Sequence, residues 1–185
     1  ALEAERVASA ARLAEVVAAA RAAGCLALHL LTTAREPLRG EPVGLALAWQ
    51  PGQAAYVGLR RSLLDGHDEL RPEAALSALR PLLEDEALPK TAWNAKQARV
   101  ALARAGVTLR GVRSDALLMT YLLNPGRRAY DLALLAADLF GEERSGDLET
   151  VAADADPAGL ASSAGGSAAL LLRAEEPLRR RLEEA

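Results

Sequence analysis

The side chains of this chain that could take part in chemistry are few and scattered. The only cysteine, Cys25, can form neither an internal disulfide nor a cysteine-based zinc site, and in the apolar segment CLALHLL we expect it to be a small buried residue. His29 lies in the same segment, which favours a buried or partly exposed histidine over a metal ligand. His67 has Asp65 and Asp68 beside it, which favours solvated surface and leaves a metal site open.

Two common catalytic patterns are not visible in the sequence. No Ser, His and Asp arrangement with a nucleophile elbow is present. Gly165 and Gly166 lack the lysine and the strand context of a phosphate-binding loop. Neither serine hydrolase chemistry nor P-loop nucleotide binding is therefore indicated.

Length and composition favour one ordinary domain. A chain of 185 residues with 51% hydrophobic residues can bury a core. Aromatic residues make up only 3%, which argues against base stacking as a main activity, and a net charge of −3 argues against a surface built throughout to neutralise phosphates. With no signal peptide and no apolar stretch of about 18 residues, we expect a cytoplasmic protein without membrane contact, and the initial Ala suggests an excised piece of a longer protein.

Hydrophobic periodicity and turn residues predict alternating strands and helices. The strands are predicted at 25–31, 43–49, 54–59, 90–93 and 107–112. The helices are predicted at 2–24, 71–85, 94–106, 115–123 and 130–140. Gly24 is expected to end the first helix, Pro51 and Gly52 to form a hairpin turn, and Ser114 to cap the fourth helix.

The last third of the chain is harder to assign. The segment 141–166 is small, acidic and glycine-rich, which predicts a loop. Residues 167–185 are predicted to form a charged helix that is interrupted or begins near Pro177. Together the segments predict an α/β fold whose mixed central sheet is flanked by helices.

Four segments match a known pattern. They are VGLALA at 43–48, AAYV at 54–57, NAKQA at 94–98, and the phrase from 106 to 125 that ends in YLLNP. In these segments the chain resembles the 3′–5′ exonuclease domain of bacterial family A DNA polymerases, the DNA polymerase I type, over most of 25–140 with a looser tail to 172. The resemblance implies a ribonuclease H-like (DnaQ-like exonuclease) fold.

The resemblance also implies two-metal DNA hydrolysis by carboxylates, but other residues occupy the ligand positions. His29 and Leu31 stand at the family's first Asp and Glu, and Ala98 stands at the carboxylate of Asn-x-Lys-x-Asp. Two divalent cations about 3.5–4 Å apart need hard oxygen ligands, which Leu and Ala do not have. Asp115 and Asp131 match acidic positions outside the metal set, where helix caps or ion pairs are favoured.

The third ligand motif has two possible registers. Matching the helix that follows it places Leu160 on the family's tyrosine and Ala164 on its metal-binding Asp. The other register uses AADAD, with Asp154 and Asp156. The first register is preferred because Pro157 would interrupt the helix that directly follows the motif in the family, and the second stays open.

Four residues are candidates for weak nucleic-acid binding. Asn94 and Lys96 begin a helix that faces the nucleotide in active relatives, although a structural role is now favoured. Arg127 and Arg128 could contact phosphate or form solvated surface.

The resemblance, together with the lost carboxylates, implies an inactive exonuclease-like domain without a cofactor, serving as a scaffold in a DNA polymerase I that acts in replication and repair. The expected partner is the polymerase domain of the same parent, since EEPLRRRLEE resembles the beginning of that domain. Two alternatives remain: an active proofreading exonuclease that uses Mg²⁺, and a module that binds single-stranded DNA or a partner protein.

The resemblance also sets the expected domain organisation. Residues 1–24 are expected to be an N-terminal helix or linker, 25–172 the exonuclease-like domain, and 173–185 the beginning of a linker to the polymerase domain. The surface facing the polymerase is expected to use Leu171, Leu178 and Leu182.

Overall fold

A six-stranded mixed sheet forms the centre of the described part of the chain. The computed structural model describes residues 4–60, 70–144, 150–151 and 157–185. The strands are β1 (Glu5–Val7), β2 (Leu26–Thr32), β3 (Pro42–Gln50), β4 (Gln53–Gly58), β5 (Lys90–Ala92) and β6 (Val112–Asp115). The helices are α1 (Ala10–Ala23), α2 (Pro72–Leu83), α3 (Ala95–Arg104), α4 (Ala116–Leu123), α5 (Leu132–Phe140) and α6 (Pro157–Glu183).

The strand order is β1-β4-β3-β2-β5-β6. β3 pairs antiparallel with both β2 and β4, whereas β1 with β4, β2 with β5, and β5 with β6 pair parallel. The hairpin between β3 and β4 turns at Gly52, whose φ of +81° lies in the left-handed region that favours glycine. The predicted mixed sheet and the predicted hairpin are thus confirmed.

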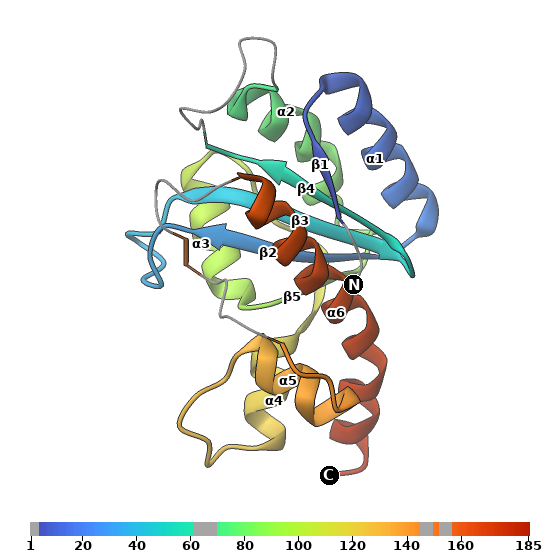
Figure 1. Cartoon of the computed structure of the whole chain (residues 1–185), viewed down its shortest axis with the longest axis vertical. Helices are drawn as coiled ribbons and strands as arrows, with labels where there is room; N and C mark the ends of the chain where they lie inside the picture. Colours follow the sequence, from blue (N-terminus) through green and yellow to red (C-terminus); the bar gives the residue numbers. More distant parts are fainter. Residues whose placement is uncertain (1–3, 61–69, 145–149, 152–156) are drawn as a thin grey trace.

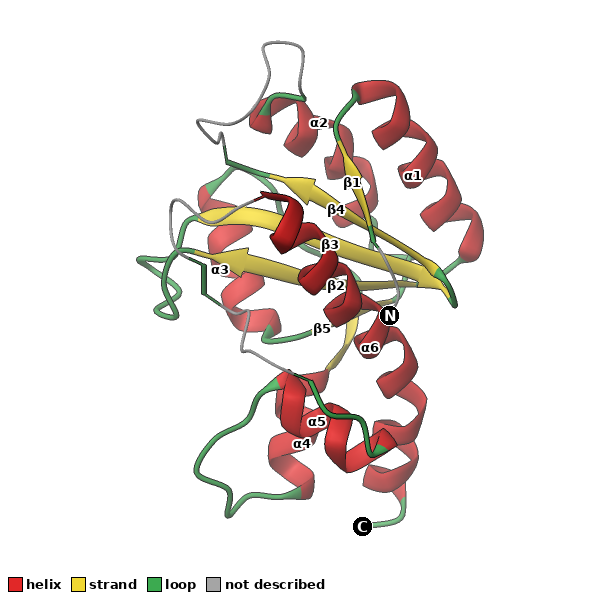
Figure 2. Ribbon diagram, viewed as in Figure 1, coloured by secondary structure: helices red, strands yellow, loops and turns green. Residues whose placement is uncertain are grey.

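Helices cover both faces of the sheet (Figure 1). Leu28 and Leu30 of β2 belong to a core cluster with α1, α2 and α3, which we call the first cluster. Ala27 and Leu31 belong to a second cluster, which α6 closes from the opposite face. β2 is therefore apolar on both sides, as expected for a central strand. α4 and α5 pack beside the C-terminal half of α6, away from the strands (Figure 2).

The predicted first helix is wrong at its N-terminal end. Glu5–Val7 is an edge strand paired with β4, and α1 begins only after Ser9, whose hydroxyl accepts a hydrogen bond from the Arg12 backbone N–H at 3.2 Å. Val7 is buried in this pairing, so tertiary contact overrides the local helical periodicity. The predicted end at Gly24 is confirmed by its φ of +75°.

The predicted strand at 107–112 is also wrong. β6 begins at Val112, because Gly111 has a φ of +70° that an extended strand cannot continue through. The cap of α4 is Asp115 and not Ser114, whose hydroxyl instead donates to Glu175 at 3.2 Å.

α6 is longer than the sequence predicts. It begins at Pro157, and proline is tolerated there because a backbone N–H in the first helical turn would have no hydrogen-bond partner within the helix. The helix then continues through Pro177 without a break. Part of the predicted loop at 141–166 is therefore helix. Leu171 and Leu178 are buried in the second cluster, so their predicted role in facing a polymerase domain is wrong, and Leu182 is half-buried.

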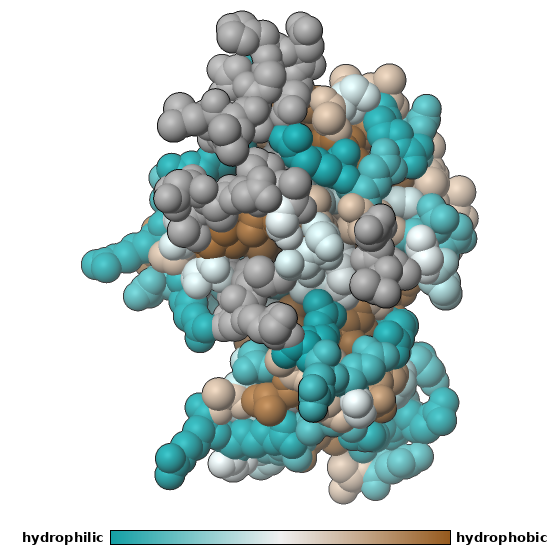
Figure 3. Space-filling model, viewed as in Figure 1, coloured by the Kyte–Doolittle hydropathy of each residue, from teal (hydrophilic) through white to brown (hydrophobic). Residues whose placement is uncertain are grey.

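The face of the molecule seen in Figure 3 is largely hydrophilic where its residues are described. On this face, hydrophilic residues predominate and hydrophobic residues show as separate areas between them (Figure 3). Within the described residues, no helix combines the length and the apolar character needed to cross a membrane.

Candidate active-site region

β2 places His29 and Leu31 inside the protein. Side chains alternate along a strand, so both residues point to the face that α6 covers. His29 is 1% exposed and pairs across the sheet with Ala46, and Leu31 is fully buried opposite Gly44. The two positions where the family pattern has Asp and Glu are therefore closed to solvent in this structure.

An aromatic ring closes the sheet surface next to Leu31. A Cβ atom added to Gly44 would lie 2.1 Å from the hydroxyl oxygen of Tyr56, so only glycine leaves room for this ring. Tyr56 is 2% exposed and packs in the second cluster with Leu31. The ring and the leucine together fill the space above this end of the sheet.

α6 carries the residues that the preferred register matches to the third ligand motif of the family. Ala164 is fully buried and Leu160 is 9% exposed, and both pack in the second cluster with Leu31 and Trp93. The structure thus places Leu31 and Ala164 in the same buried cluster. Ala98 packs in the first cluster, with the helices of the opposite face.

The donor set at these positions does not fit a magnesium site. Leu31, Ala98 and Ala164 have no side-chain atom that binds a cation, and His29 alone supplies one imidazole where Mg²⁺ prefers several oxygen ligands. Over the residues that the structure describes, no group of three or more His, Cys, Asp or Glu side chains is placed to hold a metal. The residues of the open alternatives lie outside that description: Asp65, His67, Asp68, Asp154 and Asp156.

A neutral hydrogen-bond network joins the beginning of α3 to the end of β2. The Gln97 side-chain N–H group donates to the Thr32 hydroxyl at 2.6 Å and to the Ala34 carbonyl at 2.9 Å. Its amide oxygen accepts from the Asn94 side chain at 3.0 Å, and the Asn94 oxygen accepts from the Gln97 backbone at 3.3 Å. Asn94 adopts a φ of +54°, a conformation that asparagine tolerates better than most residues. Asn94 therefore caps α3 in this structure, and DNA contact by Asn94 stays a prediction.

Gln97 is not among the site residues predicted from the sequence. A local signal for it exists, because Asn94 followed by Gln97 three residues later has the spacing of a capping box. The hydrogen bonds from Gln97 to Thr32 and Ala34 have no such signal, since they join segments more than 60 residues apart.

Asp115 and Asp131 are helix caps, as predicted. One Asp115 carboxylate oxygen accepts from the Ala95 backbone N–H at 2.8 Å, and the other accepts from the Leu117 and Leu118 backbone N–H groups. The Asp131 carboxylate accepts from the Leu134 backbone N–H at 2.7 Å. Asp115 therefore ties the first turns of α3 and α4 together.

The other candidates for nucleic-acid binding lie on separate elements. Lys96 is exposed in the first turn of α3. Arg127 and Arg128 follow α4, where Arg127 forms an ion pair with Asp138 and Arg128 is exposed. The hydrogen bond that the Arg127 guanidinium donates to the Asp138 carboxylate raises the pKa of Arg127. DNA contact by these residues stays a prediction.

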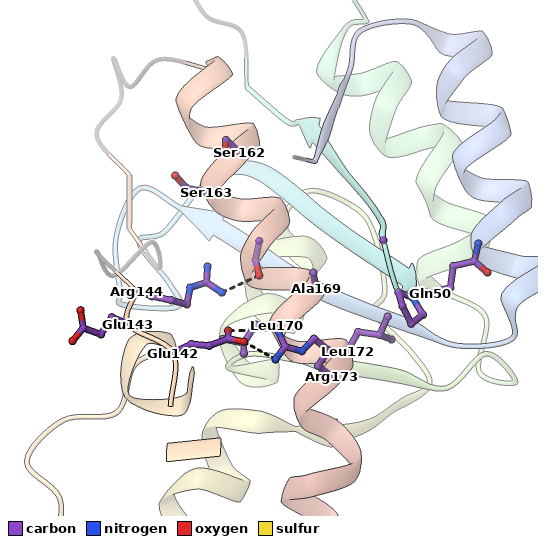
Figure 4. Close-up of a pocket in the computed structure, with 13 residues that line it drawn as sticks. Gln50, Glu142, Glu143, Arg144, Ser162, Ser163, Ala169, Leu170, Leu172 and Arg173 are labelled. Carbon is purple, nitrogen blue, oxygen red and sulfur yellow. Dashed lines mark hydrogen bonds and ion pairs between the residues drawn. The ribbon is translucent and has the colours of Figure 1, made fainter. Parts of the chain in front are cut away.

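A cavity of about 650 Å³ lies beside α6 (Figure 4). Arg144 points into it, half-buried, and its guanidinium donates to the Gly166 carbonyl at 2.9 Å and to the Ser167 hydroxyl at 3.3 Å. Burial lowers the pKa of Arg144. No sequence signal marked Arg144, because its partners Gly166 and Ser167 lie more than 20 residues away, where the predicted loop meets the predicted last helix.

An ion pair lies on the same side of α6 (Figure 4). Glu142 and Arg173 approach to 2.8 Å, and the hydrogen bond from Arg173 lowers the pKa of Glu142. The Arg173 guanidinium also lies 4.2 Å from the centre of the Phe140 ring. These contacts fix the segment after α5 on α6.

Solved structures of other proteins share this architecture. The catalytic core of RRP6 from Trypanosoma brucei superposes with a TM-score of 0.76 and 16% identity, covering 99% of this chain and 48% of that one. Escherichia coli RNase D gives a TM-score of 0.69 at 14% identity, with 98% and 45% covered. The POL domain of Pol1 from M. smegmatis gives 0.75 at 24% identity, with 97% and 28% covered. The fold is thus ribonuclease H-like, of the exonuclease type.

Sequence comparison identifies the family within this class. Residues 68–151 match the family described as DNA polymerase I, ribonuclease H-like domain. DNA polymerase I of Pseudomonas aeruginosa is 35% identical over 118 residues, and that of Geobacillus stearothermophilus is 44% identical over 85 residues. These matches cover 63% and 45% of this chain but only 13% and 10% of the relatives' lengths. The chain belongs to the 3′–5′ exonuclease-like domains of bacterial DNA polymerase I.

Proposed function

We propose that this domain has lost DNA hydrolysis and acts as a structural scaffold in a DNA polymerase I. The observation that supports the proposal is the packing of Leu31 and Ala164 in one buried apolar cluster with Tyr56 and Trp93. In an active exonuclease of this type, the corresponding positions must hold two divalent cations. An apolar interior at those positions offers neither charge nor oxygen to the metals.

The proposal includes the parent protein. The curated relatives are DNA polymerases, and this chain spans 13% of the first and 10% of the second. We infer that the parent carries out DNA synthesis in replication and repair, and that the scaffold supports its polymerase domain. The retained fold is consistent with this role, because an apolar core can be kept without a catalytic site.

The decisive experiment measures nuclease activity and metal binding of the purified chain. Labelled single-stranded DNA is incubated with the chain and millimolar Mg²⁺ or Mn²⁺, with and without a chelator. We expect no digestion, and no saturable millimolar binding of either ion by calorimetry. Chelator-sensitive digestion that survives further purification would overturn the proposal.

Two variants identify the alternative if activity is found. Loss of digestion in Asp154→Asn and Asp156→Asn would assign catalysis to the second register of the third motif. Salt-sensitive binding of single-stranded DNA without digestion would instead assign a DNA-binding module.

A further inference from the structure

A groove of about 680 Å³ lies between α3 and α4, over the edge strand β6. We call it the α3–α4 groove. Its apolar lining is Ala95, Val100, Val112, Leu118, Met119 and Leu122. Its basic lining is Lys96, Arg99, Arg113 and Arg179. The groove is separate from the buried cluster around Leu31 and Ala164 and from the cavity beside Arg144.

Two leucines of α4 give the groove an exposed apolar wall. Leu118 is 57% exposed and Leu122 is 63% exposed, and they lie one helical turn apart on the same side of α4. Their neighbours Leu117 and Leu123 are partly buried against the second cluster, so α4 has an inner and an outer apolar side. Single exposed leucines are ordinary, whereas two adjacent ones lining a groove form a patch suited to binding.

The uncompensated charge of the groove is positive. Lys96 and Arg99 form no ion pair with any residue of the described segments. Arg113 is paired with Glu86 at 3.6 Å, and Arg179 with Glu175 and Glu176. The acidic residue of the lining is Asp115, whose carboxylate already accepts three backbone hydrogen bonds.

We propose that the α3–α4 groove binds an acidic amphipathic helix of a protein partner. Aliphatic side chains of the partner would pack on Leu118 and Leu122, and its carboxylates would face Lys96 and Arg99. A protein segment fits better than single-stranded nucleic acid, because the lining contains no aromatic ring on which bases could stack. The inference goes beyond the scaffold role and does not depend on the loss of nuclease activity.

The test uses a synthetic helical peptide of about four turns, with leucines along one face and glutamates beside them. Fluorescence anisotropy with the 185-residue chain is expected to show saturable binding that weakens as salt is raised, because exposed charge pairs are screened. A matched peptide with lysines in place of the glutamates is expected to bind at least about tenfold more weakly.

Four variants locate the binding. Leu118→Ser with Leu122→Ser, and Lys96→Glu with Arg99→Glu, should each weaken the glutamate peptide by about tenfold or more. The charge-reversed variant should gain affinity for the lysine peptide, a result that misfolding cannot produce. Leu38→Ser and Arg128→Glu change exposed residues outside the groove lining and should leave both affinities unchanged.

Three binding outcomes and one change of oligomeric state would overturn the inference. The binding outcomes are equal binding of the two peptides, no binding of either, and binding of oligothymidylate in place of the glutamate peptide with the same dependence on Lys96 and Arg99. Self-association through the groove would also overturn it, and would appear as a concentration-dependent mass in sedimentation that the Leu118→Ser and Leu122→Ser pair removes.

Discussion

Gln97 precedes Ala98, the position where the family pattern places a carboxylate, and its side chain forms hydrogen bonds with neutral groups. Its side chain is 4% exposed and joins Asn94 of the α3 cap to Thr32 and the Ala34 carbonyl at the end of β2. A buried polar group that loses its partner costs about 1–3 kcal/mol. This amide therefore provides a metal-independent link between α3 and the sheet.

Replacing this amide tests the link. Gln97→Leu removes both donors and the acceptor, so we expect the free energy of unfolding to fall by about 2 kcal/mol, measured by urea denaturation. Arg99→Gln on the same helix changes an exposed side chain and should shift it by less than about 0.5 kcal/mol. Equal effects of the two substitutions would show that the network contributes nothing specific.

The pair of Glu142 and Arg173 predicts a dependence of stability on pH. Because Arg173 lowers the pKa of Glu142 below its ordinary 4.5, the unfolded state takes up the proton first as the pH falls. The stabilisation by Glu142 is therefore complete above pH 4.5 and is lost as the pH falls through the lower, folded-state pKa.

Glu142→Gln isolates this dependence. We expect the variant to be less stable than the wild type at pH 7 and the difference to shrink toward pH 3, as followed by urea midpoints. Glu143→Gln changes the next residue in the same cavity lining and serves as the control. A difference that stays constant over this pH range would mean that the pair has no part in acid stability.

At the scale of elements, two adjacent glycines of α6 meet different surroundings. A Cβ atom at Gly165 would lie 1.7 Å from the Ala4 Cβ, whereas at Gly166 the nearest contact is an Arg144 nitrogen at 3.4 Å. Gly165 thus allows the chain before β1 to lie against α6, and Gly166 has room for a methyl group if the flexible Arg144 end shifts slightly.

The two glycines therefore respond oppositely to alanine. Gly166→Ala should leave the protein unchanged or stabilise it by up to about 1 kcal/mol through helix propensity. Gly165→Ala should destabilise it by about 1–3 kcal/mol, because the segment before β1 must move. Thermal unfolding measures both. A stabilised Gly165→Ala would contradict the close packing of the two segments.

The same elements show what the sequence could predict. β2, the β3–β4 hairpin and the beginning of α5 follow from local signals: an apolar run, a Pro-Gly turn, and an Asp cap. For α4 the sequence predicted the cap one residue early, at Ser114 in place of Asp115. β1 and the first three turns of α6 do not follow from local signals, because their residues gain stability from distant partners. β1 pairs with β4 across the sheet, and the small residues of α6 favour a helix only when they pack on the strands.

Part of the candidate site could likewise be predicted from the sequence, and part depends on contacts between distant segments. The sequence and its family resemblance identified the apolar residues at 31, 98 and 164, but the ring of Tyr56 that lies over Gly44 depends on the pairing of β3 with β4. The α3–α4 groove likewise does not follow from the sequence, since its lining comes from four separate elements: α3, β6, α4 and α6.

At the scale of the whole molecule, the proposed scaffold role predicts what deletion would do. Removing this domain from a parent polymerase should lower the yield and the unfolding temperature of the remainder more than it changes the error rate. Expression, calorimetry and a mutation-reporter assay measure these properties, and replacement by an unrelated domain of similar size controls for chain length. A several-fold rise in mutation frequency with unchanged stability would show that proofreading is retained.

α6 packs on the sheet with its N-terminal half and on α4 and α5 with its C-terminal half (Figure 1). At about 1.5 Å per residue, its 27 residues make a rod of roughly 40 Å that both layers share. If α6 detaches, it uncovers both the sheet face and the α4–α5 pair in one event. Amide protons of the covered strands and of α4 and α5 should consequently exchange with a common opening free energy, as expected for a single cooperative unit.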